Sequence, residues 1–460
     1  MRIPGPSITA AVVEVTTACN LRCSHCCASA GAPRSEELST DRLVGVFEDL
    51  SRMGCSRVSL TGGEPLVRPD WLELVQAASR LGMRVGLMTN GTLFTDREAE
   101  AARDAGLISL GFSVDGVGEA HDRARGTMGT FEEVRRGMGA AREAGLKIGA
   151  VTQINRANVG ELERIGEFLA AEGASAWRVQ LGQPMGRMSE IPFKILGASD
   201  LPPLAKRLVG LLDNQPTRLV AGHSLSLAMP ASANGLSGKA GAVRGGCPAG
   251  DTVLSILSGG DVVGCPTIAA VLPTEFAVVG NVKERSLEEI WDRGRCFDDY
   301  RQALRSLLGG ECATCRSLDT CLGGCPGSWV EVGDGYENAQ CARFLRARST
   351  VSDNRVGNLI TAAAFVANCA LFLSFAACEE PEQFTVACPD CDTDTDTDSD
   401  TDTDTDTGTD TGTDTDTDTD PDVDAGADGG PDSGTDVDGG PDSGAGADAG
   451  TTDGGMDGGK

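Results

Sequence analysis

Residues 19–26 read CNLRCSHC, so that Cys19, Cys23 and Cys26 form a Cys-x3-Cys-x2-Cys triplet. An apolar run at Ala11–Val15 precedes the triplet and predicts a strand that leads into its loop. Three thiolates on one short loop can hold three irons of a [4Fe–4S] cube and leave the fourth iron open to another ligand. Taken alone, the spacing also fits a zinc-binding loop or a chance match.

Short apolar runs alternate with amphipathic stretches on both sides of this loop. Six runs predict strands: Ala11–Val15, Arg57–Leu60, Arg84–Met88, Ile108–Phe112, Lys147–Thr152 and Trp177–Leu181. Between them, Thr40–Met53 predicts a helix that stops at Gly54, and Asn158–Glu172 predicts a helix with Asn158 as its N-cap. Strands that alternate with helices favour parallel βαβ units. We therefore expect an α/β fold, a partial (β/α)6 barrel of the TIM type, with its working loops at the carboxyl ends of the strands.

Four short motifs stand where the first four predicted strands end. The cysteine triplet follows the first strand, Thr61-Gly62-Gly63-Glu64-Pro65 the second, Thr89-Asn90-Gly91 the third and Ser113-Val114-Asp115-Gly116 the fourth. Each of the last three, taken singly, is explained as an ordinary turn. However, the carboxyl ends of parallel strands meet at one mouth of a barrel. The sequence therefore predicts one shared site at that mouth.

These motifs, with His121-Asp122-x-x-Arg125-Gly126, resemble the radical S-adenosylmethionine (SAM) superfamily over roughly residues 10–187. The resemblance implies a cluster on Cys19, Cys23 and Cys26 that binds SAM and, when reduced, cleaves it to a 5′-deoxyadenosyl radical. That radical would abstract a hydrogen atom from the substrate. An electron donor such as flavodoxin or ferredoxin is implied as a partner.

The resemblance also implies which residues contact SAM. The candidates are Gly62, Gly63, Glu64, Asn90, Ser113 and Arg125. Glu64 and the adjoining backbone would hold the amino group of SAM, since paired glycines let a backbone approach a ligand closely. Ser113 and Arg125 would lie near its carboxylate or ribose. His25 would shape the cluster loop and His121 is equally well explained as a structural turn residue, so no catalytic residue is indicated.

A second cysteine pattern occupies residues 246–345. Its seven members are Cys247, Cys265, Cys312, Cys315, Cys321, Cys325 and Cys341. The spacing resembles the SPASM extension of peptide- and protein-modifying radical SAM enzymes, and a pair of zinc knuckles is the alternative. The resemblance implies two auxiliary [4Fe–4S] clusters. Cys247, Cys265 and Cys325 would hold the first, whose fourth ligand stays open, and Cys312, Cys315, Cys321 and Cys341 would hold the second.

Local signals within and around this pattern predict a hairpin and a helix start. Residues 252–257 and 262–263, joined by Ser258-Gly259-Gly260-Asp261, predict a β-hairpin. Ser286 and Glu289 have the spacing of a capping box at the start of a helix. Among the cysteines outside both patterns, those before residue 346 are expected to be small buried apolar side chains: Cys27, Cys55 and Cys296.

The acidity of the chain is concentrated at its C-terminal end. Residues 379–460 carry 27 acidic side chains and one lysine, which accounts for −26 of the whole-chain net charge of −29 and leaves −3 for residues 1–378. The Thr-Asp repeats in this tail lack apolar side chains to bury and predict a disordered spacer. A nearly neutral remainder has no basic surface of the kind that nucleic-acid binding requires.

Residues 356–378 form an apolar segment in which Leu359–Ala377 contains 19 uncharged residues. If it spans a membrane, the arginines before it place the enzyme in the cytoplasm, and Met1–Ser7 shows no signal peptide. A buried helix is one alternative. Another is a lipoprotein-like signal that ends at Cys378, in which case the region around Cys388–Asp392 would be a substrate fused to its own enzyme.

We therefore expect five regions: a radical SAM barrel (8–188), a bridging region (189–245), a SPASM domain (246–345), the apolar segment (356–378) and the disordered tail (379–460). The leading function is the maturation of a peptide or protein substrate by radical SAM chemistry. The substrate is either another chain or the C-terminal segment itself, with a leader-binding protein as a separate partner. The alternatives are an enzyme of tetrapyrrole, haem-type or other small-molecule biosynthesis, and a zinc-stabilised, membrane-anchored binding module.

Overall fold

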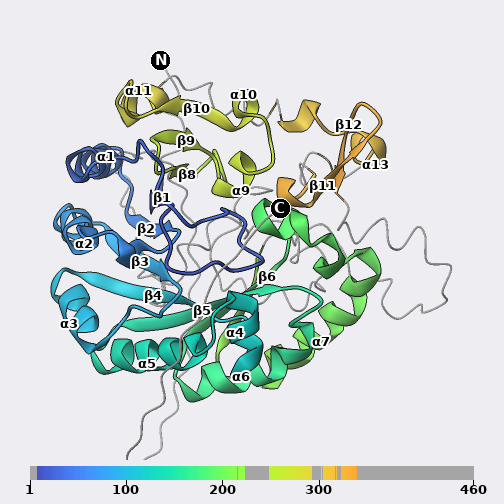
Figure 1. The fold of residues 1–460 in the computed structure, drawn as a ribbon. Coiled ribbons are helices and arrows are strands. Elements are labelled where there is room, and N and C mark those ends of the chain that lie inside the picture. The colour runs from blue at the N-terminus through green and yellow to red at the C-terminus, as the bar shows by residue number, and fades with distance from the viewer. Residues whose placement is uncertain are drawn as a thin grey trace, which may run out of the picture. The chain divides into compact units, whose positions relative to one another are not determined.

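Ten strands form one curved sheet in the part of the chain that the structure describes (Figure 1). The structure is a computed structural model that describes residues 8–214, 216–222, 248–292, 302, 304–315, 318 and 323–338. All of these residues belong to one unit, Met1–Phe384, and a second unit, Thr385–Lys460, lies outside the described residues. The predictions for residues 356–378 and 379–460 therefore fall outside the description.

The sheet has the strand order β10-β9-β8-β1-β2-β3-β4-β5-β6-β7. Its strands are β1 (Ala10–Thr16), β2 (Arg57–Gly62), β3 (Arg84–Thr89), β4 (Leu107–Ser113), β5 (Lys147–Ile154), β6 (Ala176–Leu181), β7 (Arg218–Ala221), β8 (Val253–Ile256), β9 (Asp261–Val263) and β10 (Val278–Asn281). The eight strands from β8 to β7 in this order pair in parallel, and β9 and β10 are antiparallel. A separate antiparallel pair is formed by β11 (Trp329–Val332) and β12 (Gly335–Asn338).

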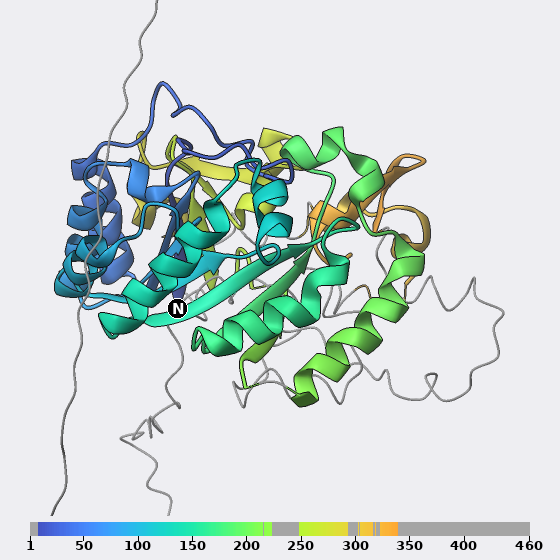
Figure 2. The same ribbon diagram turned by 60° about the horizontal axis from the view of Figure 1, so that its bottom comes forward.

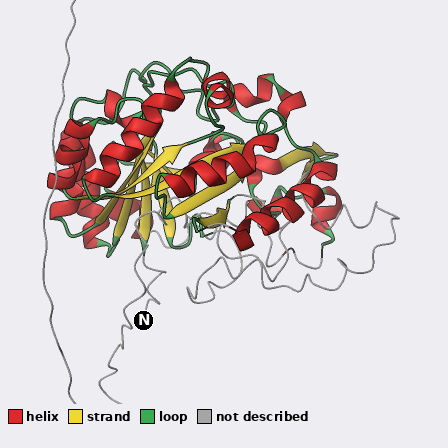
Figure 3. Ribbon diagram, turned by 90° about the horizontal axis from the view of Figure 1, so that it is seen from below, coloured by secondary structure: helices red, strands yellow, loops and turns green. Residues whose placement is uncertain are grey.

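Helices cover the outer face of the curved sheet, as Figures 2 and 3 show. The helices of the described residues are α1 (Thr40–Arg52), α2 (Trp71–Arg80), α3 (Asp96–Asp104), α4 (Glu119–Arg125), α5 (Thr130–Glu143), α6 (Leu162–Ala171), α7 (Leu201–Asn214), α9 (Pro266–Ala269), α10 (Thr274–Ala277), α11 (Leu287–Asp292) and α13 (Gly310–Ala313). Of these, α13 packs against β12 and not against the large sheet. Short 3-10 turns are η1 (Pro65–Val67), η2 (Val159–Glu161), η3 (Gly186–Glu190), η4 (Pro192–Lys194), η5 (Ala198–Asp200) and η7 (Pro326–Ser328). Apolar side chains from strands and helices share one continuous core. The expected partial TIM-like barrel is confirmed.

The local predictions agree with this fold in most places. All six predicted strands are present, each extended by one or two residues, and α1 ends before Gly54, whose φ is 80°. The hairpin forms as β8 and β9. Ser286 and Glu289 make the reciprocal bonds of a capping box, at 3.0 and 3.2 Å. The expected N-cap is wrong, because the Asn158 side chain makes no cap bond and η2 precedes α6.

The hairpin of the iron–sulfur segment continues the barrel sheet. β8 pairs in parallel with β1, in the register Ala10 to Val253, on the edge of β1 opposite to β2. Every residue of β1 is also buried, including Glu14, whose carboxylate accepts bonds from Ser258 N–H at 3.2 Å and from the Ser258 hydroxyl at 2.8 Å. The strand that leads into the cysteine triplet is thus an interior strand, fixed from both sides.

Candidate active site

The loop between β1 and α1, which carries the cysteine triplet, is tied at its base. The backbone N–H of Cys19 donates to Gly31 O at 2.9 Å, and that of Gly31 donates to Thr17 O at 3.0 Å. Within the loop, Cys26 N–H donates to Cys23 O at 3.3 Å. The two ends of the loop are held together, and the three cysteines are confined between them.

Each of the three sulfur atoms accepts a hydrogen bond. Backbone N–H groups donate to Cys19 Sγ and to Cys26 Sγ, each at 3.4 Å, and Arg125 Nη1 donates to Cys23 Sγ at 3.7 Å. Burial raises the pKa of the Cys19 thiol, and the charges of Cys23 and Cys26 act in the same direction, so the sulfurs share one electrostatic environment. Sulfurs that accept N–H bonds suit an iron–sulfur cluster, whose potential depends on such bonds.

The paired glycines after β2 pack against the backbone that leads into this loop. A Cβ atom on Gly62 would lie 2.3 Å from Thr16 O, and one on Gly63 would lie 2.2 Å from Ala18 O. Gly63 N–H donates to Thr16 O and Glu64 N–H donates to Ala18 O, both at 2.8 Å. Close approach to a ligand is therefore not the whole reason why glycine is needed at these two positions. A side chain at either one would collide with the backbone of residues 16–18.

Glu64 carries a fully buried carboxylate at the end of β2. It accepts hydrogen bonds from Asn90 N–H at 2.6 Å and from the Thr89 hydroxyl at 2.9 Å. Desolvation by burial raises the pKa of Glu64 to about 7, although these donors act to lower it. The carboxylate thus connects the ends of β2 and β3 at the barrel mouth.

Asn90 directs its side chain from the end of β3 to the cluster loop. Its Nδ2 atom donates to Asn20 Oδ1 at 2.8 Å and lies 3.9 Å from Cys19 Sγ. The following Gly91 has a φ of 80°, and a Cβ atom there would lie 2.8 Å from a ring carbon of Phe112. The Asn-Gly turn therefore requires glycine, and it places an amide beside the first cysteine of the triplet.

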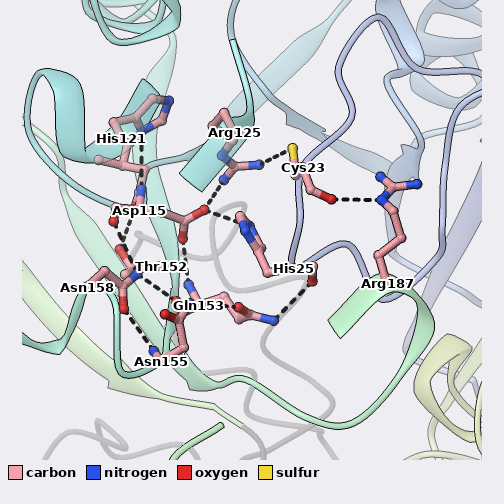
Figure 4. Close-up of polar contacts among 11 residues, drawn as sticks. Cys23, His25, Asp115, His121, Arg125, Thr152, Gln153, Asn155, Asn158 and Arg187 are labelled. Carbon is pink, nitrogen blue, oxygen red and sulfur yellow. Dashed lines mark hydrogen bonds and ion pairs between the residues drawn. The ribbon is translucent and has the colours of Figure 1, made fainter. Parts of the chain in front are cut away.

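Asp115, in the Ser-x-Asp-Gly motif after β4, lies at the centre of a buried charge network (Figure 4). Its Oδ2 atom is 2.7 Å from Arg125 Nη2 and 2.9 Å from His25 Nε2, and its Oδ1 atom accepts from Gln153 N–H at 2.8 Å. Burial alone would raise the pKa of Asp115, but Arg125 and His25 outweigh it and hold that pKa well below its usual range. Because Arg125 also donates to Cys23, the network joins β4 to the cluster loop.

His121 and Asn158 hold the backbone of Asp115. Asp115 N–H donates to His121 Nδ1 at 3.3 Å, and Asn158 Nδ2 donates to Asp115 O at 3.1 Å. Desolvation by burial, aided by the charge of Arg125, lowers the pKa of His121 to about 4, so its ring is neutral near pH 7. His121 therefore has the structural role that the sequence left open. The role of Asn158 was not predicted, because its partner lies 43 positions away.

The structure brings the candidate SAM contacts to the same mouth as the triplet. Gly62 ends β2, Gly63 and Glu64 follow it, Asn90 follows β3, Ser113 ends β4 half-buried, and Arg125 ends α4. Two further residues in the turn after β6 contact the cysteine regions: Arg187 contacts the radical-cluster loop and Gln183 contacts the segment after Cys325. No motif in the sequence marked them, because each acts through contacts more than 140 positions away.

Four of the seven cysteines in the second pattern lie within the described residues. Cys265 directly precedes α9 and Cys325 directly precedes η7, two turns that pack together, while Cys312 lies in α13 and Cys315 follows it. The remaining three, Cys247, Cys321 and Cys341, lie outside the description, as does Cys296. Cys55 is buried as expected, but Cys27 is exposed, so that expectation was wrong for Cys27.

Comparison with known proteins decides the family. A model described as the Radical SAM superfamily matches residues 13–169, and one described as an Iron-sulfur cluster-binding domain matches residues 247–316. Mycofactocin maturase MftC of Mycobacterium tuberculosis is 33% identical over 322 residues, which cover 68% of this chain and 76% of that protein. The chain belongs to the radical SAM superfamily. This radical SAM enzyme also carries the SPASM-type domain, and membership overturns the reading as a zinc-stabilised binding module.

This radical SAM enzyme is also similar to a heme synthase and to a solved structure that contains a precursor peptide. AdoMet-dependent heme synthase of Methanosarcina barkeri is 29% identical over 335 residues, which cover 70% of this chain and 93% of that protein. Among solved structures, SuiB of Streptococcus suis bound to precursor peptide SuiA has a TM-score of 0.58 and 19% identity, covering 73% of this chain and 76% of that one. At this level of identity, the likeness to SuiB shows the fold alone.

The cofactors of this radical SAM enzyme are [4Fe–4S] clusters and SAM. When bound, they supply an electron and a carbon-centred radical for hydrogen abstraction. The residues present fit them, because three thiols with N–H donors occupy one loop and the loop is anchored by β2, β3 and β4. Among the described residues, no three His, Cys, Asp or Glu side chains converge as a single-ion site requires.

Membrane association was one of the alternatives that the sequence left open for residues 356–378, which lie outside the described residues. Within the described ranges, no helix combines the length and the apolar character that a membrane crossing needs.

Proposed function

We propose that this radical SAM enzyme modifies a peptide or protein substrate. The observation that carries the proposal is the 33% identity to mycofactocin maturase, which extends over 322 residues. The name of that relative describes an enzyme that matures a product. The likeness of the fold to SuiB, a protein solved with its precursor peptide, is compatible with such a substrate.

The proposed ligands follow the cysteine patterns. Cys19, Cys23 and Cys26 hold the cluster that binds SAM; Cys247, Cys265 and Cys325 hold the first auxiliary cluster; Cys312, Cys315, Cys321 and Cys341 hold the second. Gly62, Gly63, Glu64, Asn90, Ser113 and Arg125 surround SAM. The domain limits proposed from sequence, 8–188 for the barrel, 189–245 for the bridging region and 246–345 for the SPASM domain, go with this assignment.

The chain's own residues orient the reactants in this proposal. Asp115 holds the guanidinium of Arg125 in place beside Cys23, through contacts of 2.7 Å to Asp115 and 3.7 Å to Cys23 Sγ. Asn90 presents its amide at Cys19. The neutral His121 and Asn158 keep the Asp115 turn in place without adding charge. The electrostatic arrangement is thus built before any substrate arrives.

A second candidate substrate class is a small molecule of the tetrapyrrole type. It is favoured by the match to heme synthase, which covers 93% of that relative's length. The two candidates share clusters and SAM and differ in the substrate alone, so a substrate screen separates them.

The first experiment tests the reaction class. Protein reconstituted without oxygen is reduced with dithionite in the presence of SAM, and 5′-deoxyadenosine is measured. The matched control replaces Cys19, Cys23 and Cys26 with alanine and leaves both auxiliary sites intact. We expect 5′-deoxyadenosine from the wild-type chain and none from the control; none from either would refute the proposal.

The second experiment tests the substrate. The full chain is incubated with SAM, reductant and flavodoxin or ferredoxin, and residues 379–460 are then mapped by mass spectrometry. A mass change near Cys388–Asp392, absent from the triple alanine control, identifies the chain's own C-terminal segment as substrate. An unchanged tail directs the search to separate peptides, offered with and without a leader-binding protein, and conversion of a porphyrin precursor instead would contradict a peptide substrate.

A further inference from the structure

The turn after β6 contacts the radical-cluster loop through Arg187. Its Nε atom donates to Cys23 O at 2.8 Å and its Nη1 atom donates to Ala30 O at 2.8 Å, while its backbone N–H donates to Cys26 O at 3.1 Å. Figure 4 shows the guanidinium beside the loop, on the side of Cys23 opposite to Arg125. Three bonds to carbonyls spread over residues 23–30 hold the loop in one conformation.

Gly186 lets this turn lie directly against the loop. It has a φ of 50°, and a Cβ atom there would lie 2.4 Å from Cys27 O and 2.5 Å from Cys26 O. Both the backbone conformation and the contact distance therefore require glycine. The turn and the loop are fitted to each other rather than being accidental neighbours.

Gln183, four residues before Arg187, contacts the iron–sulfur domain instead. It is 2% exposed, its Nε2 atom donates to Ser328 Oγ at 2.9 Å, and its Oε1 atom lies 3.9 Å from Cys325 Sγ. A Cβ atom on Gly327 would lie 2.0 Å from the same Oε1 atom. The amide is thus enclosed by the segment that begins with the proposed auxiliary ligand Cys325.

Cys265, another proposed ligand of that cluster, begins a segment that packs against Gly327 as well. The Thr267 side chain, two residues after Cys265, is 3.0 Å from where a Cβ atom of Gly327 would be. Cys265 and Cys325 therefore directly precede two turns, α9 and η7, that pack against each other.

We propose that Gln183 and Arg187 are positioning residues that fix the separation between the SAM-binding cluster and the auxiliary cluster on Cys265 and Cys325. The segment 183–187 is short and begins and ends in contacts with the two cluster regions, so it acts as a spacer of defined length. The proposal rests on the ligand assignment of the proposed function. A fixed spacer holds the two clusters at one separation, and it thereby also fixes how far the auxiliary cluster lies from SAM.

The test compares Gln183→Ala and Arg187→Ala with the wild-type chain, reconstituted without oxygen. Iron and sulfide content is measured first, and pulsed EPR then gives the distribution of distances between the two reduced clusters. The expected result is a broader distribution in both variants, with iron content retained. Arg187→Ala also alters the EPR signal of the SAM-bound cluster, whereas Gln183→Ala alters the auxiliary signal, because each variant frees one end of the spacer.

Arg156→Ala is the matched control, since Arg156 is an arginine of the neighbouring loop that contacts Ile195 O at 3.1 Å and Asp200 and does not touch either cysteine region among the described residues. It should leave the distribution unchanged. If Arg187→Ala does not fold, Arg187→Lys, which keeps the charge but not the two-pronged contact, should show a smaller broadening. Wild-type distributions in all variants would overturn the proposal, whereas clusters missing from the wild-type chain would overturn the proposed function itself.

Discussion

Arg125 and Asp115 form an ion pair with 2.7 Å between Nη2 and Oδ2, and their side chains are 11% and 1% exposed. The carboxylate balances a guanidinium that would otherwise be buried alone beside Cys23. Asp115→Asn removes that balance, and breaking a buried pair in this way costs about 3–5 kcal/mol. We expect a loss of this size in the free energy of unfolding, measured with urea under anaerobic conditions.

Helix α4 offers a matched control for this substitution. Arg123 and Glu119 form a pair at 3.1 Å on the same helix, but both side chains are exposed. Because solvent screens an exposed pair, Glu119→Gln should cost less than about 1 kcal/mol. Equal losses from Asp115→Asn and Glu119→Gln would contradict the role of burial.

The same Asp115→Asn substitution also predicts a change in the reduction potential of the SAM-binding cluster. A reduced cluster carries one more negative charge, and Asp115 is a fixed negative charge whose partners Arg125 and His25 adjoin the cluster loop. Removing the carboxylate therefore favours reduction, and the potential should rise. Potentiometry followed by EPR measures it; a potential that falls would show that Arg125 moves away from Cys23 when its partner is lost.

Because His121 is buried in its neutral form, we expect the free energy of unfolding to fall in acid. Its pKa is lowered to about 4 by burial first and Arg125 second, while Asp115 and Asp122 oppose this and His25 adds to it. The unfolded chain takes up the proton near the ordinary histidine pKa of about 6.5. The unfolded state therefore binds more protons between these values, and stability falls as pH falls, by about 2 kcal/mol from about pH 7 to about pH 5.

The variant His121→Asn tests this dependence, because its amide oxygen can still accept from Asp115 N–H but does not titrate. Denaturant midpoints at the two pH values should differ less for the variant than for the wild-type chain. An identical difference in both proteins would assign the acid sensitivity to another group.

The strand ends and their motifs were predictable because each is a local pattern. A run such as Arg84–Met88 identifies a strand, and Asn90-Gly91 identifies the turn after it. The sequence also supported the clustering of the motifs, since parallel strands end on one side of a sheet. The core position of β1 was not predictable, because it depends on β8, which lies more than 240 positions away in the register Ala10 to Val253.

The residues missed by sequence reasoning share one physical property. Asn158, Gln183 and Arg187 act through side-chain bonds to distant backbone or hydroxyl groups, and such bonds leave no periodic pattern. Asn158 even has the features of an N-cap, but its amide is used by Asp115 O. Local propensity gave way to tertiary contacts at the positions that build the site.

We expect a single methyl group added at Gly63 to destabilise the protein strongly. A Cβ atom there would lie 2.2 Å from Ala18 O, which is backbone and cannot rotate away. Gly63→Ala must therefore displace the chain that enters the cluster loop, at a cost of at least about 1–3 kcal/mol. We expect a lower unfolding midpoint and less iron per chain after reconstitution. Gly31→Ala is the control at the other end of the same loop, since nothing lies within 4 Å of its Cβ position, and equal iron losses in both variants would refute the steric argument.

Cys26, the proposed third ligand of the SAM-binding cluster, is followed directly by a second cysteine, Cys27. Three observations favour Cys26: its sulfur accepts from Ala30 N–H at 3.4 Å, its carbonyl is fixed by Arg187 N–H at 3.1 Å, and its charge acts on Cys19 together with that of Cys23. We therefore expect Cys26→Ser to lose the EPR signal of the SAM-bound cluster and Cys27→Ser to keep it, with both proteins reconstituted side by side. Serine nearly preserves the size of the side chain, so the comparison isolates the sulfur atom. The reverse result would move the third ligand to Cys27 and would require the loop to turn by one residue against Gly186.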